Sequence, residues 1–137
     1  MFSGCIKTSP TTFTINPSMT ATIGSYNFVA SSVVPSTLNA QVHDTITTLI
    51  ITGYSSDPNN INDKIVITVT SYKAVPGTWS IDQGQASGTY YHNGEAYPAL
   101  GGVVSISNVT STNMVGYFSF NASTYSVTNG SFNVGLP

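Results

Sequence analysis

Charged side chains are scarce in this sequence. Three Lys and five Asp or Glu make up 6% of the 137 residues, and Arg is absent. About a quarter of an average globular domain is charged, and a soluble helical bundle needs such residues on its wet face. Three Lys also cannot neutralise the phosphates of a nucleic acid. The composition therefore excludes a helical bundle and makes nucleic acid an unsuitable partner.

Cysteines and long hydrophobic runs are equally scarce. A single cysteine, Cys5, excludes an intrachain disulfide and a cysteine-based zinc site. No apolar run approaches the roughly 18 residues of a membrane-spanning helix. The polar surface must instead come from 19 Ser, 19 Thr and 12 Asn. Because 40% of the residues are hydrophobic and 11% aromatic, we expect one packed domain rather than a disordered chain.

From Met19 onward, apolar and polar residues alternate, which predicts β-strands. The clearest strand is 64–70, where Ile65, Ile67 and Val69 share one face. The same pattern predicts strands at 19–23, 26–30, 45–52, 78–82, 86–92, 102–108, 114–121 and after 125. The prediction is an all-β, single-domain antiparallel β-sandwich of eight to ten short strands. A closed up-and-down β-barrel is the alternative, because both folds bury one face of each strand.

Local signals refine this prediction. Gly24-Ser25 and Asn93-Gly94 are typical of tight hairpin turns. Pro35 limits any strand in the ambiguous segment 31–44 to an edge or a short piece. Near the end of the chain, 125–127 and 132–134 place their apolar residues in opposite phases. One extra residue must fit near Asn129-Gly130, as a β-bulge with Gly in the left-handed region or as a tight hairpin.

The amino terminus resembles the end of a bacterial lipobox. Ser3 and Gly4 are small residues directly before Cys5, although Phe2 stands where Leu is usual. In that motif the Cys thiol carries a diacylglycerol, which supplies membrane affinity. Because the charged and apolar parts of a signal peptide are missing, we expect the sequence to lack most of a leader. Residues 1–18 are predicted to be a lipobox remnant and flexible tether, and 19–137 the β-sandwich domain; a free cysteine in a frayed terminus is the alternative.

The carboxy-terminal third carries a further pattern, with Gly102-Val103-Val104-Ser105-Ile106, then Val115-Gly116-Tyr117-Phe118-Ser119-Phe120, then Val127-Thr128-Asn129-Gly130-Ser131-Phe132. This pattern resembles a domain-of-unknown-function family of bacterial envelope lipoproteins, in which the penultimate strand reads roughly I-x-G-T-F-S-F-x-A and the chain ends V-T-N-G-x-F. Tyr117 replaces the usual Thr of that motif. The resemblance implies a secreted, lipid-anchored, all-β protein. The predicted location is the bacterial cell envelope, either anchored in the outer membrane or exposed on the surface. The resemblance implies no activity.

Groups suited to catalysis are few. The Gly-x-Ser-x-Gly elbow is absent. His92 and Glu95 flank the Asn93-Gly94 turn and could lie close together, but a pair of solvated residues at a hairpin tip is the expectation. His43 and Asp44 are strand neighbours whose side chains point to opposite faces. The sequence therefore predicts no catalytic residues, no cofactor and no enzyme.

A metal site is not predicted either. Asp57, Asn59, Asn60, Asn62 and Asp63 supply oxygens in one loop, and such oxygens suit calcium. The spacing does not fit an EF-hand, because the loop has no Gly at the sixth position and no Glu at the twelfth. Residues of these types are also the ordinary formers of turns.

Aromatic residues give the candidate ligand site. Trp79, Tyr90, Tyr91, His92 and Tyr97 fall within one short segment, and exposed aromatic faces stack on sugars. Alternation places Tyr90 and His92 on one face and Tyr91 on the other. The competing interpretation is that Trp79 and one Tyr belong to the core while the rest cover a sheet edge.

Two functional hypotheses follow. The first is a non-catalytic, lipid-anchored envelope protein that binds a glycan or a protein partner, or serves as an accessory subunit. The second is a structural subunit that assembles into an extracellular fibre or shell. A charge-poor surface with open strand edges gives little protection against self-association, so homo-oligomers stay an open alternative.

Overall fold

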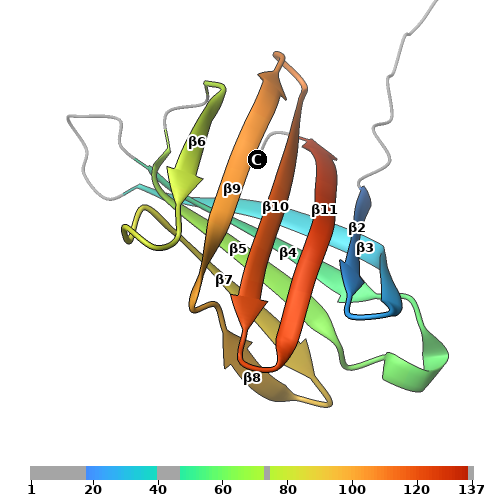
Figure 1. Cartoon of the computed structure of the whole chain (residues 1–137). Coiled ribbons are helices and arrows are strands. Elements are labelled where there is room, and N and C mark those ends of the chain that lie inside the picture. Colours follow the sequence, from blue (N-terminus) through green and yellow to red (C-terminus); the bar gives the residue numbers. More distant parts are fainter. Residues whose placement is uncertain (1–17, 40–46, 73–74, 136–137) are drawn as a thin grey trace, which may run out of the picture.

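The computed structural model describes residues 18–39, 47–72 and 75–135, which form a β-structure (Figure 1). Cys5, His43 and Asp44 lie outside the described residues. The strands are β2 (Ser18–Ile23), β3 (Tyr26–Asn39), β4 (Thr47–Ser55), β5 (Lys64–Tyr72), β6 (Gly77–Ser80), β7 (Ala86–His92), β8 (Glu95–Pro98), β9 (Gly101–Val109), β10 (Asn113–Ala122) and β11 (Tyr125–Gly135). A 3-10 turn, η1 (Pro58–Asn60), precedes β5.

All ten strands belong to one antiparallel sheet in the order β6-β9-β10-β11-β2-β3-β4-β5-β7-β8. The sheet folds over on itself as a half-barrel, so that β9, β10 and β11 lie in front of β3, β4, β5 and β7 (Figure 1). Within the described residues the two end strands, β6 and β8, do not pair with each other. The predicted all-β antiparallel class is confirmed. The curled sheet has two layers that face each other, as in a sandwich, and they belong to one continuous sheet, as in a barrel.

Strand β3 connects the two layers. Its first residues pair with β2, from Tyr26 opposite Ile23 to Val29 opposite Thr20. Its later residues pair with β4 instead, and the register shifts between Ala30 and Ser32. A bulge at this point bends a strand and increases its twist. The bulge therefore lets one strand of 14 residues pass from the first layer to the second.

Pro35 lies in the later part of β3, opposite Ile51 of β4. Within the described residues, β2 pairs with 26–29 only, so this part of β3 has β4 as its one neighbour and forms an edge of the second layer. Proline is tolerated there because no second neighbour needs its missing N–H. The expected edge position is confirmed, but the segment is not short: β3 continues without interruption to Asn39.

The core fills the space between the two layers. Inward residues from every long strand are buried, among them Phe28, Leu49, Ile67, Val104 and Phe132. Close approach of the layers is visible at Gly88 of β7, where an added Cβ would lie 2.9 Å from the ring of Phe120 on β10. A side chain at this position would therefore push the layers apart.

The predicted bulge near the end of the chain is present. Phe118 pairs with Gly130 and Phe120 with Val127, so β11 holds one residue more than β10 in this stretch. Asn129 takes the left-handed conformation, with φ of 52°. Of the two predicted solutions, a bulge or a tight hairpin, the bulge is confirmed, but the left-handed residue is Asn129 rather than Gly130. Asn tolerates this conformation better than most side chains.

Candidate functional site

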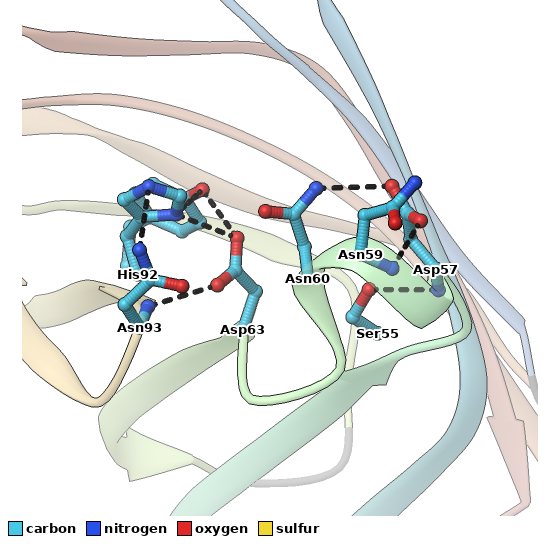
Figure 2. A network of polar contacts seen from close by, with 8 residues as sticks. Ser55, Asp57, Asn59, Asn60, Asp63, His92 and Asn93 are labelled. Carbon is cyan, nitrogen blue, oxygen red and sulfur yellow. Dashed lines mark hydrogen bonds and ion pairs between the residues drawn. The ribbon is translucent and has the colours of Figure 1, made fainter.

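A buried carboxylate organises one end of the half-barrel. Asp63 directly precedes β5 and is 1% exposed. Its Oδ2 accepts hydrogen bonds from the Tyr90 hydroxyl at 2.8 Å and from His92 Nδ1 at 2.9 Å, and its Oδ1 accepts from the backbone N–H of Asn93 at 3.0 Å (Figure 2). We call Asp63, Tyr90, His92 and Asn93 the Asp63 network. It joins the loop before β5 to the β7–β8 hairpin.

The loop that delivers Asp63 is itself held by hydrogen bonds. Asp57 caps η1 by accepting from the backbone N–H of Asn59 at 2.9 Å and from the side-chain amide of Asn60 at 3.0 Å (Figure 2). These two bonds hold the pKa of Asp57 below its ordinary value. The buried Ser55 hydroxyl accepts from the Asp57 N–H, and the Ser55 N–H donates to the Asp63 carbonyl. The loop therefore presents Asp63 in a fixed position.

The proton positions in the Asp63 network follow from its acceptor. An ionised carboxylate only accepts, so His92 Nδ1 carries the proton in its contact with Asp63 Oδ2, and the second ring nitrogen, Nε2, takes no part in that contact. Asn93 Nδ2 lies 3.4 Å from that Nε2. Burial and the bond to Asp63 raise the pKa of the Tyr90 hydroxyl well above its ordinary value, because ionisation would place two negative charges side by side.

An aspartate that orients a histidine is half of a hydrolytic triad, but the other half has no counterpart here. Among the described residues, the His92 ring bonds only Asp63, Tyr90 and Asn93, so no serine or threonine hydroxyl meets it. Glu95 stands opposite His92 in the hairpin. Its carboxylate instead interacts with the Tyr97 hydroxyl, a contact that raises the pKa of Tyr97. The network therefore binds two loops together, and no serine or threonine hydroxyl among the described residues takes part in it.

The loop oxygens are not arranged for a cation. The carboxylate oxygens of Asp57 and Asp63 accept hydrogen bonds from N–H and O–H donors, which a cation would have to displace. In the described ranges no three His, Cys, Asp or Glu gather as a ligand set. Nor does any helix there have the length and hydrophobicity to span a bilayer.

Three residues of the predicted aromatic ligand site come together. Tyr90 and Tyr97 are partners in the β7–β8 hairpin, and both rings contact Tyr125 of β11 edge-on, at centroid distances of 5.0 and 4.9 Å. His92 lies 5.9 Å from the rings of Tyr90 and Tyr125. Since Tyr90 is buried and its hydroxyl bonds Asp63, this cluster closes the end of the core rather than presenting an open ring.

The other two predicted residues lie elsewhere. Tyr91 points to the opposite face of β7, as alternation predicts, and its ring centroid is 4.5 Å from Nζ of Lys64 on β5. Trp79 lies on β6 in the other layer, opposite Val104, and packs against the core while half-buried. The five residues therefore do not form one face.

A different surface combines an exposed aromatic ring with free polar groups. Strands β6, β9, β10, β11, β2 and β3 contain no charged residue. At the centre of their outward face stands Tyr117 of β10, which is 53% exposed. A ring on a neutral, hydroxyl-rich surface is suited to an uncharged polar ligand.

The sheet register aligns this surface into a row. Tyr117 is opposite Ser131 of β11 on one side and Ser105 of β9 on the other. Ser131 is in turn opposite Thr20 of β2, and Ser105 is opposite Thr78 of β6. We call these five residues the Tyr117 row. Their inward strand neighbours, such as Phe118 and Met19, are buried, so the row faces outward.

A shallow hollow of about 640 Å³ lies beside the row. Val103, Tyr117, Ser119, Thr128 and Asn129 are among the residues that line it. It sits where the bulge at Asn129 interrupts the pairing of β10 and β11. A smaller hollow of about 380 Å³ over β2 and β3 shares Asn129 with it. The two together give the outward face of the first layer a recess large enough for a small ligand.

Tyr117 is not among the ligand-binding residues predicted from the sequence. A usable signal existed, because the alternation that places Met114, Phe118 and Phe120 inward also places Tyr117 outward. No such pattern in the sequence indicates which residues of the neighbouring strands lie beside Tyr117. The same holds for the contact between Asp63 and His92, which are 29 residues apart in the chain.

Comparison with protein-family models, with curated proteins and with solved structures finds no match to this chain.

Proposed function

We propose that this chain is a non-catalytic glycan-binding protein of the bacterial cell envelope, anchored by lipid on Cys5. The observation that carries the glycan part is the uncharged outward face centred on Tyr117. Sugars present apolar C–H faces that stack on aromatic rings and hydroxyls that bond to neutral donors and acceptors. A face built from Ser, Thr, Asn and one exposed Tyr matches both requirements without attracting ions.

Binding to polysaccharides embedded in native gels tests the ligand class. The protein is run through gels that contain neutral xylan, β-glucan or mannan, or acidic alginate. We expect retardation by at least one neutral polysaccharide and none by alginate. Retardation by none of the neutral polysaccharides, or by alginate alone, contradicts the proposal.

The Tyr117→Ala variant tests the location of the site. Loss of the stacking ring is expected to weaken binding by about tenfold, equivalent to roughly 1.4 kcal/mol. Tyr54→Ala is the matched control, because Tyr54 is 41% exposed but lies on β4 in the other layer. Equal binding by Tyr117→Ala and the unmodified protein contradicts this location.

The anchor part of the proposal depends on the Ser3-Gly4-Cys5 pattern. Mass spectrometry of the protein from its native host is expected to find a diacylglycerol thioether on Cys5 at the start of the mature chain. An unmodified Cys5, or a mature chain that starts at another residue, contradicts an envelope lipoprotein.

A self-assembling fibre or shell subunit is the second candidate. It depends on strand edges that can accept another chain. Both end strands of the sheet, β6 and β8, have only four residues, and Pro98 ends β8. The later part of β3 is a longer edge, but it carries Pro35. Because short edge strands and an edge proline both hinder pairing with another chain, these edges favour the binding protein over the polymer. Light scattering across concentration separates the two, since growth of mass with concentration supports assembly and a constant monomer mass contradicts it.

A further inference from the structure

We infer that the ligand is an extended, unbranched neutral oligosaccharide that crosses the strands along the Tyr117 row, one sugar unit above each strand. This inference rests on the proposed glycan-binding function and specifies the shape and direction of the ligand. Its starting point is the register, which places one outward residue from each of five neighbouring strands on a single line.

The row has polar groups on both sides of its central ring. Thr20 Oγ1 and Ser131 Oγ lie 3.1 Å apart on one side, and Thr78 Oγ1 and Ser105 Oγ lie 2.8 Å apart on the other. In each pair one hydroxyl donates to the other, so one O–H and several lone pairs stay available. Tyr117 is thus flanked by two hydroxyl pairs that are already held in place and still able to bond a ligand.

The direction of the ligand follows from the positions of the outward hydroxyl groups across the strands and along them. Across the strands they occupy four of the five positions of the row. Along β10, the next outward residues are Val115 and Ser119, and the bulge at Asn129 breaks the pattern on β11. A ligand that lies along β10 would therefore meet Val115 in one direction and Ser119 in the other, whereas a ligand that crosses the strands meets two hydroxyl residues on each side of Tyr117.

The spacing of the strands sets the length of the ligand. Neighbouring strands lie about 4.8 Å apart, so the five strands from β6 to β2 span about 19 Å. Each interval is close to the length of one sugar ring in an extended chain. Tyr117 then stacks under the central sugar, and the hydroxyl pairs bond the units on either side. A coiled or branched chain could touch only part of the row.

A length series measures this arrangement directly. Isothermal titration uses linear β-1,4-linked oligomers of glucose, xylose and mannose, each from two to six units. We expect the affinity of at least one series to rise by tenfold or more from the dimer to the pentamer and then to level off. Equal affinity for dimer and hexamer in every series that binds overturns the inference but leaves the proposed function standing. If no oligomer series binds and no neutral polysaccharide gel retards the protein, both the inference and the proposed function are contradicted.

Variants at the ends of the row give a second measurement. Thr78→Val and Thr20→Val preserve side-chain shape and remove a terminal hydroxyl. Each is expected to weaken pentamer binding about threefold to tenfold while leaving dimer binding unchanged. Thr68→Val is the control, because Thr68 is a half-buried residue of β5 in the other layer. Unchanged pentamer binding by both end variants, or equal losses for dimer and pentamer, overturns the crossing geometry.

Discussion

The Asp63 network and the Tyr117 row are both polar, but they use their hydrogen-bonding groups in opposite ways. In the network, a carboxylate that is 1% exposed accepts from a tyrosine, a histidine and a backbone N–H. In the row, neighbouring hydroxyls make one bond to each other, and the tyrosine between them is 53% exposed. One region has its polar atoms occupied, and the other keeps capacity for a ligand.

This difference separates a structural role for the Asp63 network from the proposed binding role of the Tyr117 row. His92 and Asp63, which resemble half of a hydrolytic triad, are occupied in joining the loop before β5 to the β7–β8 hairpin. Buried polar groups of this kind are costly to leave without partners, so their loss is expected to appear in stability. The neutral row contributes little to stability, and its loss is expected to appear in binding.

Asp63→Ala is expected to produce the largest effect. It leaves the buried Tyr90 hydroxyl and the half-buried His92 N–H without their acceptor, and each buried donor left unsatisfied costs about 1 to 3 kcal/mol. Urea unfolding at low temperature measures the loss. Asp63→Asn keeps an acceptor oxygen and should lose about half as much, whereas the exposed Asp82→Asn should change stability by less than about 0.5 kcal/mol. A loss of stability below about 1 kcal/mol for Asp63→Ala would contradict the structural role of the Asp63 network.

Gly130→Ala is expected to affect both stability and binding. A Cβ at Gly130 would overlap the ring and carbonyl of Phe118, beneath the hollow. The overlap should cost about 1 to 3 kcal/mol and distort the bulge. Gly135→Ala on the same strand is the control, since the nearest atom to its Cβ is 3.8 Å away. Equal thermal unfolding midpoints for the two variants would contradict the close packing at the bulge.

Tyr90→Phe is expected to have a smaller effect that depends on pH. At pH 7 the lost hydrogen bond to Asp63 should cost about 1.5 kcal/mol. The pKa of Tyr90 is raised in the folded state, so the tyrosine of the unfolded chain ionises first, near pH 10. The stabilising contribution is therefore complete below that pH and is lost as pH rises through the folded-state pKa. Urea unfolding from pH 8 to 11 should show a steeper decline for the unmodified protein than for Tyr90→Phe, and parallel declines would contradict the assignment.

Tyr117→Ala is expected to have the smallest effect on folding. Its ring is exposed, so the free energy of unfolding should change by no more than about 0.5 kcal/mol even though glycan binding falls. Thermal unfolding of the same samples used for the binding gels checks this. A destabilisation comparable to that of Asp63→Ala would mean that the exposed ring is part of the fold and would erase the contrast between the two regions.

Much of the strand layout could be predicted from the sequence. Alternation located β7 at its observed limits, Ala86–His92, and the phase change after Val127 predicted one extra residue near Asn129-Gly130, which the structure accommodates as a bulge at Asn129. These features depend on residues a few positions apart. The later part of β3 was harder, because Pro35 weakens the strand signal and only its edge position makes the strand tolerable.

The two polar regions could not be predicted in the same way. Local alternation told which face each side chain would occupy, and it correctly put Tyr91 opposite Tyr90. It could not bring Asp63 to His92, or set Ser131, Tyr117 and Ser105 in one line, because these contacts join distant segments. Register between strands is fixed by how the whole sheet packs its hydrophobic face.

The sequence by itself determined an all-β domain with a neutral surface, because eight charged residues leave hydroxyls and amides to cover the outward faces of period-two strands. The tertiary structure alone decided which of those polar residues have their hydrogen-bonding groups occupied within the protein and which keep unused donors and acceptors. Pairing of β5 with β7 brought the buried Asp63 to its donors, and the register of the other layer aligned hydroxyls beside Tyr117. Both outcomes depend on the pairing of strands far apart in the chain, which no local pattern encodes.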